Sequence, residues 1–169
     1  MGADIHLYIE YKIGDLPWKA DENHVAEIGY TGYRSALSYR NYSLFAALAG
    51  VRGDGPDPKG LPSDTSEKVL EAADAWGADG HSFNYNSLKE FTSIVKKVLG
   101  NDFNEKAKPK AFFVNDVEEL NSSADYDSVI SYCKERVKKF KEELEAESIL
   151  LDQPINTEVE CRLVYWFDN

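Results

Sequence analysis

The chain has 169 residues, 43% of them hydrophobic and 29% charged, a composition that is typical of one globular domain and excludes an intrinsically disordered chain. Its 30 Asp and Glu residues outnumber its 19 Lys and Arg residues, and the net charge of −11 argues against general binding to nucleic acid or to anionic lipid. There are two cysteines without a C-x-x-C pair, no signal-peptide pattern and no run of about 18 apolar residues. We therefore expect a cytoplasmic protein with neither a disulfide framework nor a membrane span.

Strands are predicted at both ends of the chain. Apolar and polar residues alternate from Asp4 to Lys12 and again from Thr157 to Phe167. Both faces of the second segment carry large apolar groups in its last half, which predicts a strand inside the sheet. Turn residues at 13–16 follow the first strand, and residues 17–20 are expected to begin a short returning strand.

Helices are predicted in the middle of the chain, where apolar residues recur at spacings of three and four. Asn41 is the predicted N-cap of the first helix, and capping boxes that start at Asp64 and Ser87 predict the beginnings of the next two. The longest apolar stripe predicts a helix from about Asp125 to Glu147, and it includes Cys133, which we expect in the core.

The remaining segments are expected to connect these elements. Residues 29–40 and 77–82 read as polar loops, and residues 111–114 form either a short strand or part of a loop. Residues 1–169 are therefore expected to form a single α+β domain, in which the terminal strands build an antiparallel or mixed sheet and the middle of the chain supplies the helices.

Two acid-x-His units are candidate metal ligands. Asp4 and His6 are two apart on a predicted strand, so both project from one face, and Asp79 and His81 repeat the unit in a predicted turn. Two carboxylates and two imidazoles would suit a divalent ion such as zinc, manganese or iron. The alternative is that each pair is a hydrogen bond that fixes a strand end or a turn, because so short a pattern also occurs by chance. The third histidine, His24, lies in a polar connection and is expected at the surface.

Arginine is concentrated beside tyrosine in one part of this acidic chain. Arg34, Arg40 and Arg52 lie near Tyr39 and Tyr42. Guanidinium groups bind phosphate or carboxylate oxygens and tyrosine rings stack on bases, so this region is a candidate pocket for a nucleotide-like anion. The alternative is that the arginines pair with the many carboxylates of the chain and the tyrosines fill the edge of the core.

Several separated blocks resemble a family of small uncharacterised proteins of bacteriophages and bacterial genomes, whose members begin Met-Gly-Cys-Asp-Ile-His. The blocks that carry the resemblance are residues 1–10, 40–52, 60–66, 79–82 and 164–169. The resemblance implies a phage context and the host-cell cytoplasm, and it transfers no established activity. Ala3 stands where the family has cysteine, so a mechanism based on that thiolate cannot operate here, and residues 84–88 also depart from the family pattern.

The polar residues that match the family pattern are the candidate site. They are Asp4, His6, Arg40, Asn41, Arg52, Asp64, Asp79 and His81. Either they form a buried polar network that joins the first strand to the middle loops, or they line a ligand site, since polar loops often carry function.

Two hypotheses about function follow. In the first, a phage-type accessory protein binds a small nucleotide-like or phosphorylated ligand through Arg40, Asn41, Arg52 and Asp64, and either sequesters it or hydrolyses it with a metal held by the acid-x-His units. In the second, the chain is a non-enzymatic acidic inhibitor that presents carboxylates to a basic surface of a host defence factor. An exposed face of the long helix could also support a homodimer.

Overall fold

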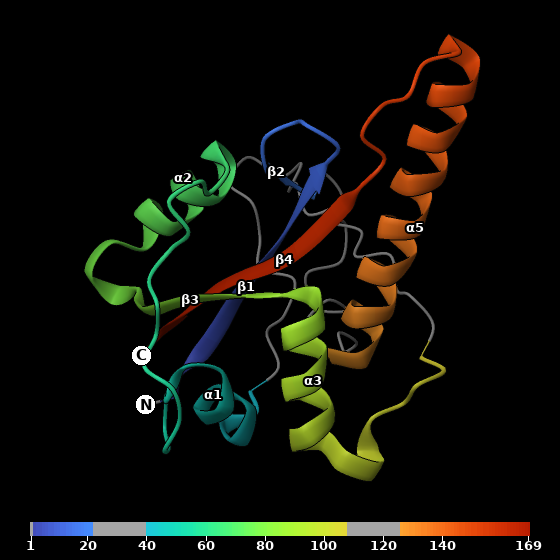
Figure 1. Cartoon of the computed structure of the whole chain (residues 1–169). Helices are drawn as coiled ribbons and strands as arrows, with labels where there is room; N and C mark the ends of the chain where they lie inside the picture. Colours follow the sequence, from blue (N-terminus) through green and yellow to red (C-terminus); the bar gives the residue numbers. More distant parts are fainter. Residues whose placement is uncertain (1, 22–39, 108–125) are drawn as a thin grey trace, which may run out of the picture.

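A four-stranded antiparallel sheet in the order β2-β1-β4-β3 lies at the centre of the computed structural model, which describes residues 2–21, 40–107 and 126–169 (Figure 1). The strands are β1 (Asp4–Ile13), β2 (Lys19–Ala20), β3 (His81–Ser87) and β4 (Val159–Asp168). β1 and β4 pair along their whole length, from Asp4 opposite Asp168 to Ile13 opposite Val159. The predicted sheet from the two ends of the chain is therefore confirmed, it is antiparallel, and its C-terminal strand is an inner one.

Among the described residues, four α-helices and two short 3-10 helices surround the sheet. They are α1 (Tyr42–Ala49), α2 (Glu67–Trp76), η2 (Gly77–Asp79), α3 (Leu88–Leu99), η3 (Gly100–Asp102) and α5 (Tyr126–Leu151). Two predicted caps are confirmed. The Asn41 side chain accepts the Leu44 N–H at 3.0 Å, and Ser87 and Glu90 form a complete capping box at the start of α3. Within the described ranges, no helix has the length and apolar character that crossing a bilayer requires.

The two faces of the sheet carry two separate hydrophobic cores, because successive side chains of a strand point to opposite faces. The larger core joins the odd-numbered residues of β1 and β4 to α1, α3 and α5. It contains Cys133, as expected, and also Cys161. The smaller core lies on the other face under α2, around Tyr8 and Trp166, whose rings stack at 4.9 Å. In Figure 1, α2 lies on one side of the sheet, and α3 and α5 lie on the other.

Three boundaries differ from the sequence prediction. α2 begins at Glu67 with Ser66 in the N-cap position, because the Asp64 carboxylate binds the Arg162 guanidinium instead of capping the helix. The predicted polar turn over 77–82 is wrong at its end, where β3 begins at His81. α5 continues to Leu151, one turn beyond the predicted end. The expectations for residues 29–39, including Arg34, for His24 and for 111–114 lie outside the described residues.

Candidate functional site

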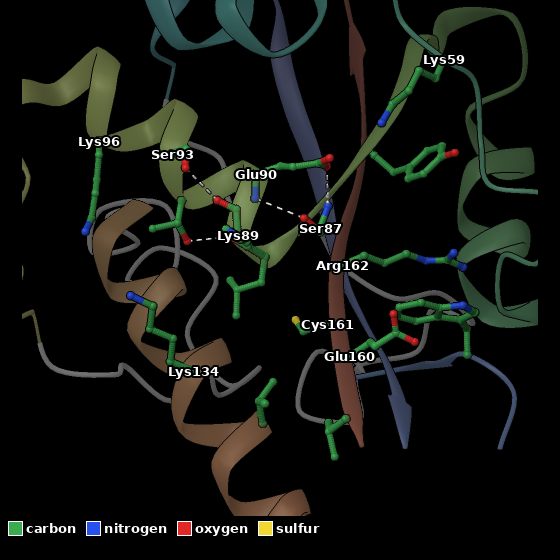
Figure 2. Close-up of a pocket in the computed structure, with 16 residues that line it drawn as sticks. Lys59, Ser87, Lys89, Glu90, Ser93, Lys96, Lys134, Glu160, Cys161 and Arg162 are labelled. Carbon is green, nitrogen blue, oxygen red and sulfur yellow. Dashed lines mark hydrogen bonds between the residues drawn. The ribbon is translucent and has the colours of Figure 1, made fainter. Parts of the chain in front are cut away.

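A groove of about 860 Å³ opens where β3 ends and α3 begins (Figure 2). α5 and the first residues of β4 form its other walls, and Trp18 and Lys59 reach it from loops. β3 pairs with β4 no further than Ser87 opposite Arg162. The stretch Val159–Cys161 therefore presents an edge that pairs with no strand of the described chain on this side. The volume is within the range of about 300–1,000 Å³ that is usual for small-molecule sites.

Cationic side chains dominate the polar lining of this groove. Lys59, Lys89, Lys96, Lys134 and Arg162 line it, whereas Glu90 and Glu160 are the carboxylates among the described lining residues. Figure 2 shows Lys96 of α3 and Lys134 of α5 on one side of β4, and Lys59 and Arg162 on the other. The whole chain carries a net charge of −11. The excess of positive charge in the groove is therefore opposite in sign to the net charge of the protein.

Arg162 forms a fixed part of the groove wall. Its guanidinium donates to Glu10 Oε1 at 2.8 Å and to Asp64 Oδ1 at 2.7 Å, and it lies 3.9 Å from the centre of the Trp18 ring. Glu10 is fully buried and also accepts the Ser66 N–H at 2.7 Å, which joins the ion pair to the start of α2. The bond to Arg162 lowers the pKa of the Asp64 carboxyl. This network orients the wall and leaves the guanidinium little capacity for a ligand.

The lysines differ in how far they are already engaged. The Lys59 ammonium lies 4.0 Å from the centre of the Tyr85 ring, and Lys96 forms an ion pair with Glu105 at 2.6 Å. Within the described chain, Lys89 and Lys134 have no carboxylate at ion-pair distance. They are the cations most available to an anion that enters the groove.

The N-terminal turn of α3 supplies the rest of the polar lining. Ser87 caps the helix by accepting the Glu90 N–H at 3.1 Å, and Glu90 accepts the Ser87 N–H at 3.0 Å. That bond from the Ser87 backbone lowers the pKa of Glu90, so this carboxylate stays charged. The Ser93 hydroxyl donates to the Lys89 carbonyl at 3.1 Å and keeps its lone pairs for other donors.

Asp4 and His6, the first acid-x-His unit, belong to a polar cluster at the end of the sheet opposite the groove. Arg40 donates to both Asp4 oxygens, at 2.5 and 2.9 Å, and this bond lowers the pKa of Asp4. His6 Nε2 lies 3.1 Å from Asp168 Oδ2, and its ring lies 3.9 Å from that of Trp76. Burial lowers the pKa of His6, and this effect outweighs the opposite influence of Asp168.

The second acid-x-His unit lies at the same end of the sheet but does not join the first. His81 pairs with Phe167, and its ring stacks on Phe167 in the larger core, whereas His6 pairs with Trp166 on the face covered by α2. Asp79 is exposed in η2. His81 Nδ1 lies 2.9 Å from the Ser82 hydroxyl, and its Nε2 is buried without a hydrogen-bond partner in the described chain.

The four metal candidates are therefore not gathered around one point. No group of three or more His, Cys, Asp or Glu side chains in residues 2–21, 40–107 and 126–169 is arranged to hold a metal ion. A divalent cofactor of zinc, manganese or iron stays a prediction that rests on sequence spacing.

The four ligand-binding candidates are also divided between places. Arg40 pairs with Asp4, Asn41 caps α1, and the Arg52 guanidinium lies 6.0 Å from the centre of the Tyr42 ring, so these three surround α1. Asp64 is next to the groove, which it reaches through Arg162. The alternative is a buried polar network that joins the first strand to the middle loops. Asp64 is joined to β1 through Arg162 and Glu10, whereas the pair of Arg40 with Asp4 is 52% and 35% exposed and is not buried.

Sequence reasoning missed the groove residues because their positions carry no local signal. Its lysines come from a loop, α3 and α5, and isolated lysines on helices are typical of solvated faces. One signal was available for the wall, since Glu10 and Arg162 are charges within strands whose neighbours are apolar on both sides. Comparison with protein-family models, curated proteins and solved structures yields no match to this chain.

Proposed function

We propose that the protein binds a small phosphorylated ligand in the groove between α3, α5 and β4 and sequesters it. The observation that carries this proposal is the excess of cationic side chains in one groove of a strongly acidic chain. Lysine is a common ligand of phosphate groups, and a charge in a hollow surrounded by protein is screened less than one on an open surface. Such a role fits the phage-type accessory protein that the sequence resemblance predicts.

The groove offers different contacts to different parts of such a ligand. Lys89 and Lys134 can bind phosphate oxygens. The Ser93 hydroxyl donates its proton to the Lys89 carbonyl, so it can only accept a hydrogen bond from a ligand. Tyr85 and Trp18 supply aromatic surface at the other side, although cations already cover one face of each ring. A nucleotide has both a phosphate and an aromatic base, which makes it the ligand class that these contacts suit best.

The first hypothesis includes ligand binding and ligand hydrolysis, and the groove supports binding. None of the described residues that line it is a histidine, and its Glu90 is engaged in the helix cap. Metal-assisted hydrolysis stays a prediction that depends on Asp4, His6, Asp79 and His81.

The experiment is isothermal titration calorimetry with AMP, ADP, cyclic AMP and pyrophosphate at low salt. We expect at least one probe to bind, and we expect binding to weaken as salt rises. In the variant Lys89→Gln/Lys134→Gln, two charge-assisted contacts of about 1.5 kcal/mol each are lost, so affinity should fall by about a hundredfold. The control is Lys97→Gln/Lys138→Gln, which removes the same charge from exposed positions of α3 and α5 outside the groove.

The two possible failures have distinct meanings. No heat from any probe at millimolar concentration would reject the proposal and leave the acidic interaction protein as the remaining hypothesis. Equal weakening in both double variants would show that the anion responds to overall charge and has no site in the groove.

A further inference from the structure

α5 leaves the body of the protein halfway along its length. The residues it buries fully all lie within Tyr126–Cys133, and from Lys134 onward its side chains are half-buried or exposed. Figure 1 shows the last turns of α5 standing beyond the end of the sheet. Near the tip, Ile149 and Leu150 are 81% and 86% exposed, more than any other large hydrophobic side chain of the described chain.

The charges of α5 beyond Cys133 are divided into two blocks, and the first of them still packs against the larger core through Val137 and Phe140. Residues 134–141 contain five cations, Lys134, Arg136, Lys138, Lys139 and Lys141, and one carboxylate, Glu135. Residues 142–147 contain four carboxylates, Glu142, Glu143, Glu145 and Glu147, and no cation.

This order of charges is unfavourable for a helix on its own. The C-terminal end of a helix carries a partial negative charge, and carboxylates near it are repelled. Lys138 with Glu142 and Lys139 with Glu143 are spaced for ion pairs along the helix, but with lysine on the N-terminal side, which is the weaker order. Lys141 and Glu145 have the same spacing and the same order. Strong compensation of the acidic block is therefore missing within its own helix.

A second α5 in antiparallel orientation would supply that compensation. It would bring the basic block of each copy beside the acidic block of the other, and the two helix dipoles would oppose each other. A parallel pair would place like charges together. The exposed face that could make the contact includes Lys139, Glu142, Ala146, Ile149 and Leu150, at spacings of three and four.

We propose that α5 pairs antiparallel with α5 of a second copy of this chain, with the boundary between Lys141 and Glu142 at the centre of the contact. The stretch from Lys134 to Ile149, which is symmetric about that boundary, has 16 residues and is about 24 Å long. So narrow a contact produces a weak dimer that depends on concentration and salt. This pairing does not rest on ligand binding in the groove, although Lys134 belongs both to the basic block and to the lining of the groove.

The test uses sedimentation velocity and two variants with opposite charge changes. One is Glu143→Lys/Glu145→Lys/Glu147→Lys, and the other is Lys138→Glu/Lys139→Glu/Lys141→Glu. We expect the wild-type chain to dimerise as its concentration rises and to dissociate in 1 M NaCl. Each variant alone should remain monomeric, and an equimolar mixture of the two should form heterodimers.

Both variants keep a net negative charge, so their net charges repel each other. Heterodimers in the mixture can therefore form only through local pairing of the opposite charges on α5. The matched control, Asp54→Lys/Asp57→Lys/Glu71→Lys, changes the same charge at exposed positions outside α5 and should dimerise like the wild type. A wild-type chain that stays monomeric at several hundred micromolar and low salt would overturn the proposal. So would a mixture that contains monomers only while circular dichroism shows both variants folded.

Cross-linking tests the orientation. The native thiols Cys133 and Cys161 are buried, so single cysteines can be introduced and oxidised with oxidised glutathione. Glu142→Cys lies at the centre of the proposed contact and should form a disulfide-linked dimer. Leu150→Cys should not, because the two tips are at opposite ends of the pair. Efficient linkage through Leu150→Cys would instead indicate a parallel or tip-to-tip contact.

Discussion

His6 shows how the environment of one residue makes stability depend on pH. Its ring lies between the Asp168 carboxylate and Trp76, and burial lowers its pKa from the ordinary value of 6.5. The neutral ring is therefore favoured in the folded protein, even though Asp168 favours the charged form. The same hydrogen bond holds the start of β1 to the end of β4.

The free energy of unfolding should fall as the pH drops below 6.5 towards the lower pKa of folded His6, because the unfolded chain takes up the proton more readily. Asp4, Asp64 and Glu90 have lowered pKa values, so their stabilisation is lost only in a more acidic range, below about pH 4. Urea denaturation of wild type and His6→Gln between pH 7.5 and 5 measures the difference. The variant should show a smaller slope, and an unchanged slope would contradict this assignment.

At the scale of elements, the Glu10–Arg162 pair joins two strands, a loop and a helix. Arg162 of β4 binds Glu10 of β1 and Asp64 of the loop, while Glu10 accepts the backbone N–H of Ser66, the N-cap residue of α2. The Glu10 and Arg162 side chains are 0% and 8% exposed, whereas the Asp64 side chain is 62% exposed. The inner pair is therefore shielded from water and the outer one is not.

We expect Arg162→Met to lower the free energy of unfolding by about 3–5 kcal/mol, because it leaves the Glu10 carboxylate buried without a counter-charge. Glu10→Gln/Arg162→Met should recover at least half of that loss, since the remaining side chain is neutral. Asp64→Asn, at the exposed end of the network, should cost less than about 1 kcal/mol. Chemical denaturation measures all three, and a double variant as unstable as Arg162→Met would refute the explanation by unpaired charge.

Elements with a strong local pattern were predictable, and those that depend on tertiary partners were not. The Ser87–Glu90 capping box and the alternation that predicts β1 are properties of neighbouring residues, and both elements are confirmed. Burial does not follow the alternation of β1, because Tyr8 and Glu10 are buried as well. Asp64 fits a cap equally well in sequence, but Arg162, 98 positions away, takes its carboxylate. β3 carries polar side chains, and Asn84 among them donates to the Leu48 carbonyl at 2.8 Å. No local sequence pattern indicates this contact.

At the scale of the whole molecule, the two layers around the sheet are unequal. In the part of the chain that the structure describes, α1, α3, α5 and most of the large buried side chains lie on one face, and α2 with a few apolar residues covers the other. The groove is also a property of the whole fold, because its lysines are brought together from separate elements. That is why the sequence predicted the architecture and not this site.

The unequal layers predict different local stabilities. In hydrogen exchange followed by mass spectrometry, the amides of β1 and β4 should exchange most slowly, and those of α2 and of α5 beyond Lys141 should exchange faster by at least about tenfold. Protection of α2 equal to that of β4 would show instead that both layers unfold as one unit.

The central position of β4 has a consequence for synthesis of the protein. β1 is translated well before β4, its partner along the full strand, because Asp4 pairs with Asp168. Contacts between residues so distant along the chain form slowly, because a very long loop must close first. Until residues 159–168 have been translated, the apolar side chains of β1 lack their main neighbour, and the nascent chain has to be kept from aggregating during that interval.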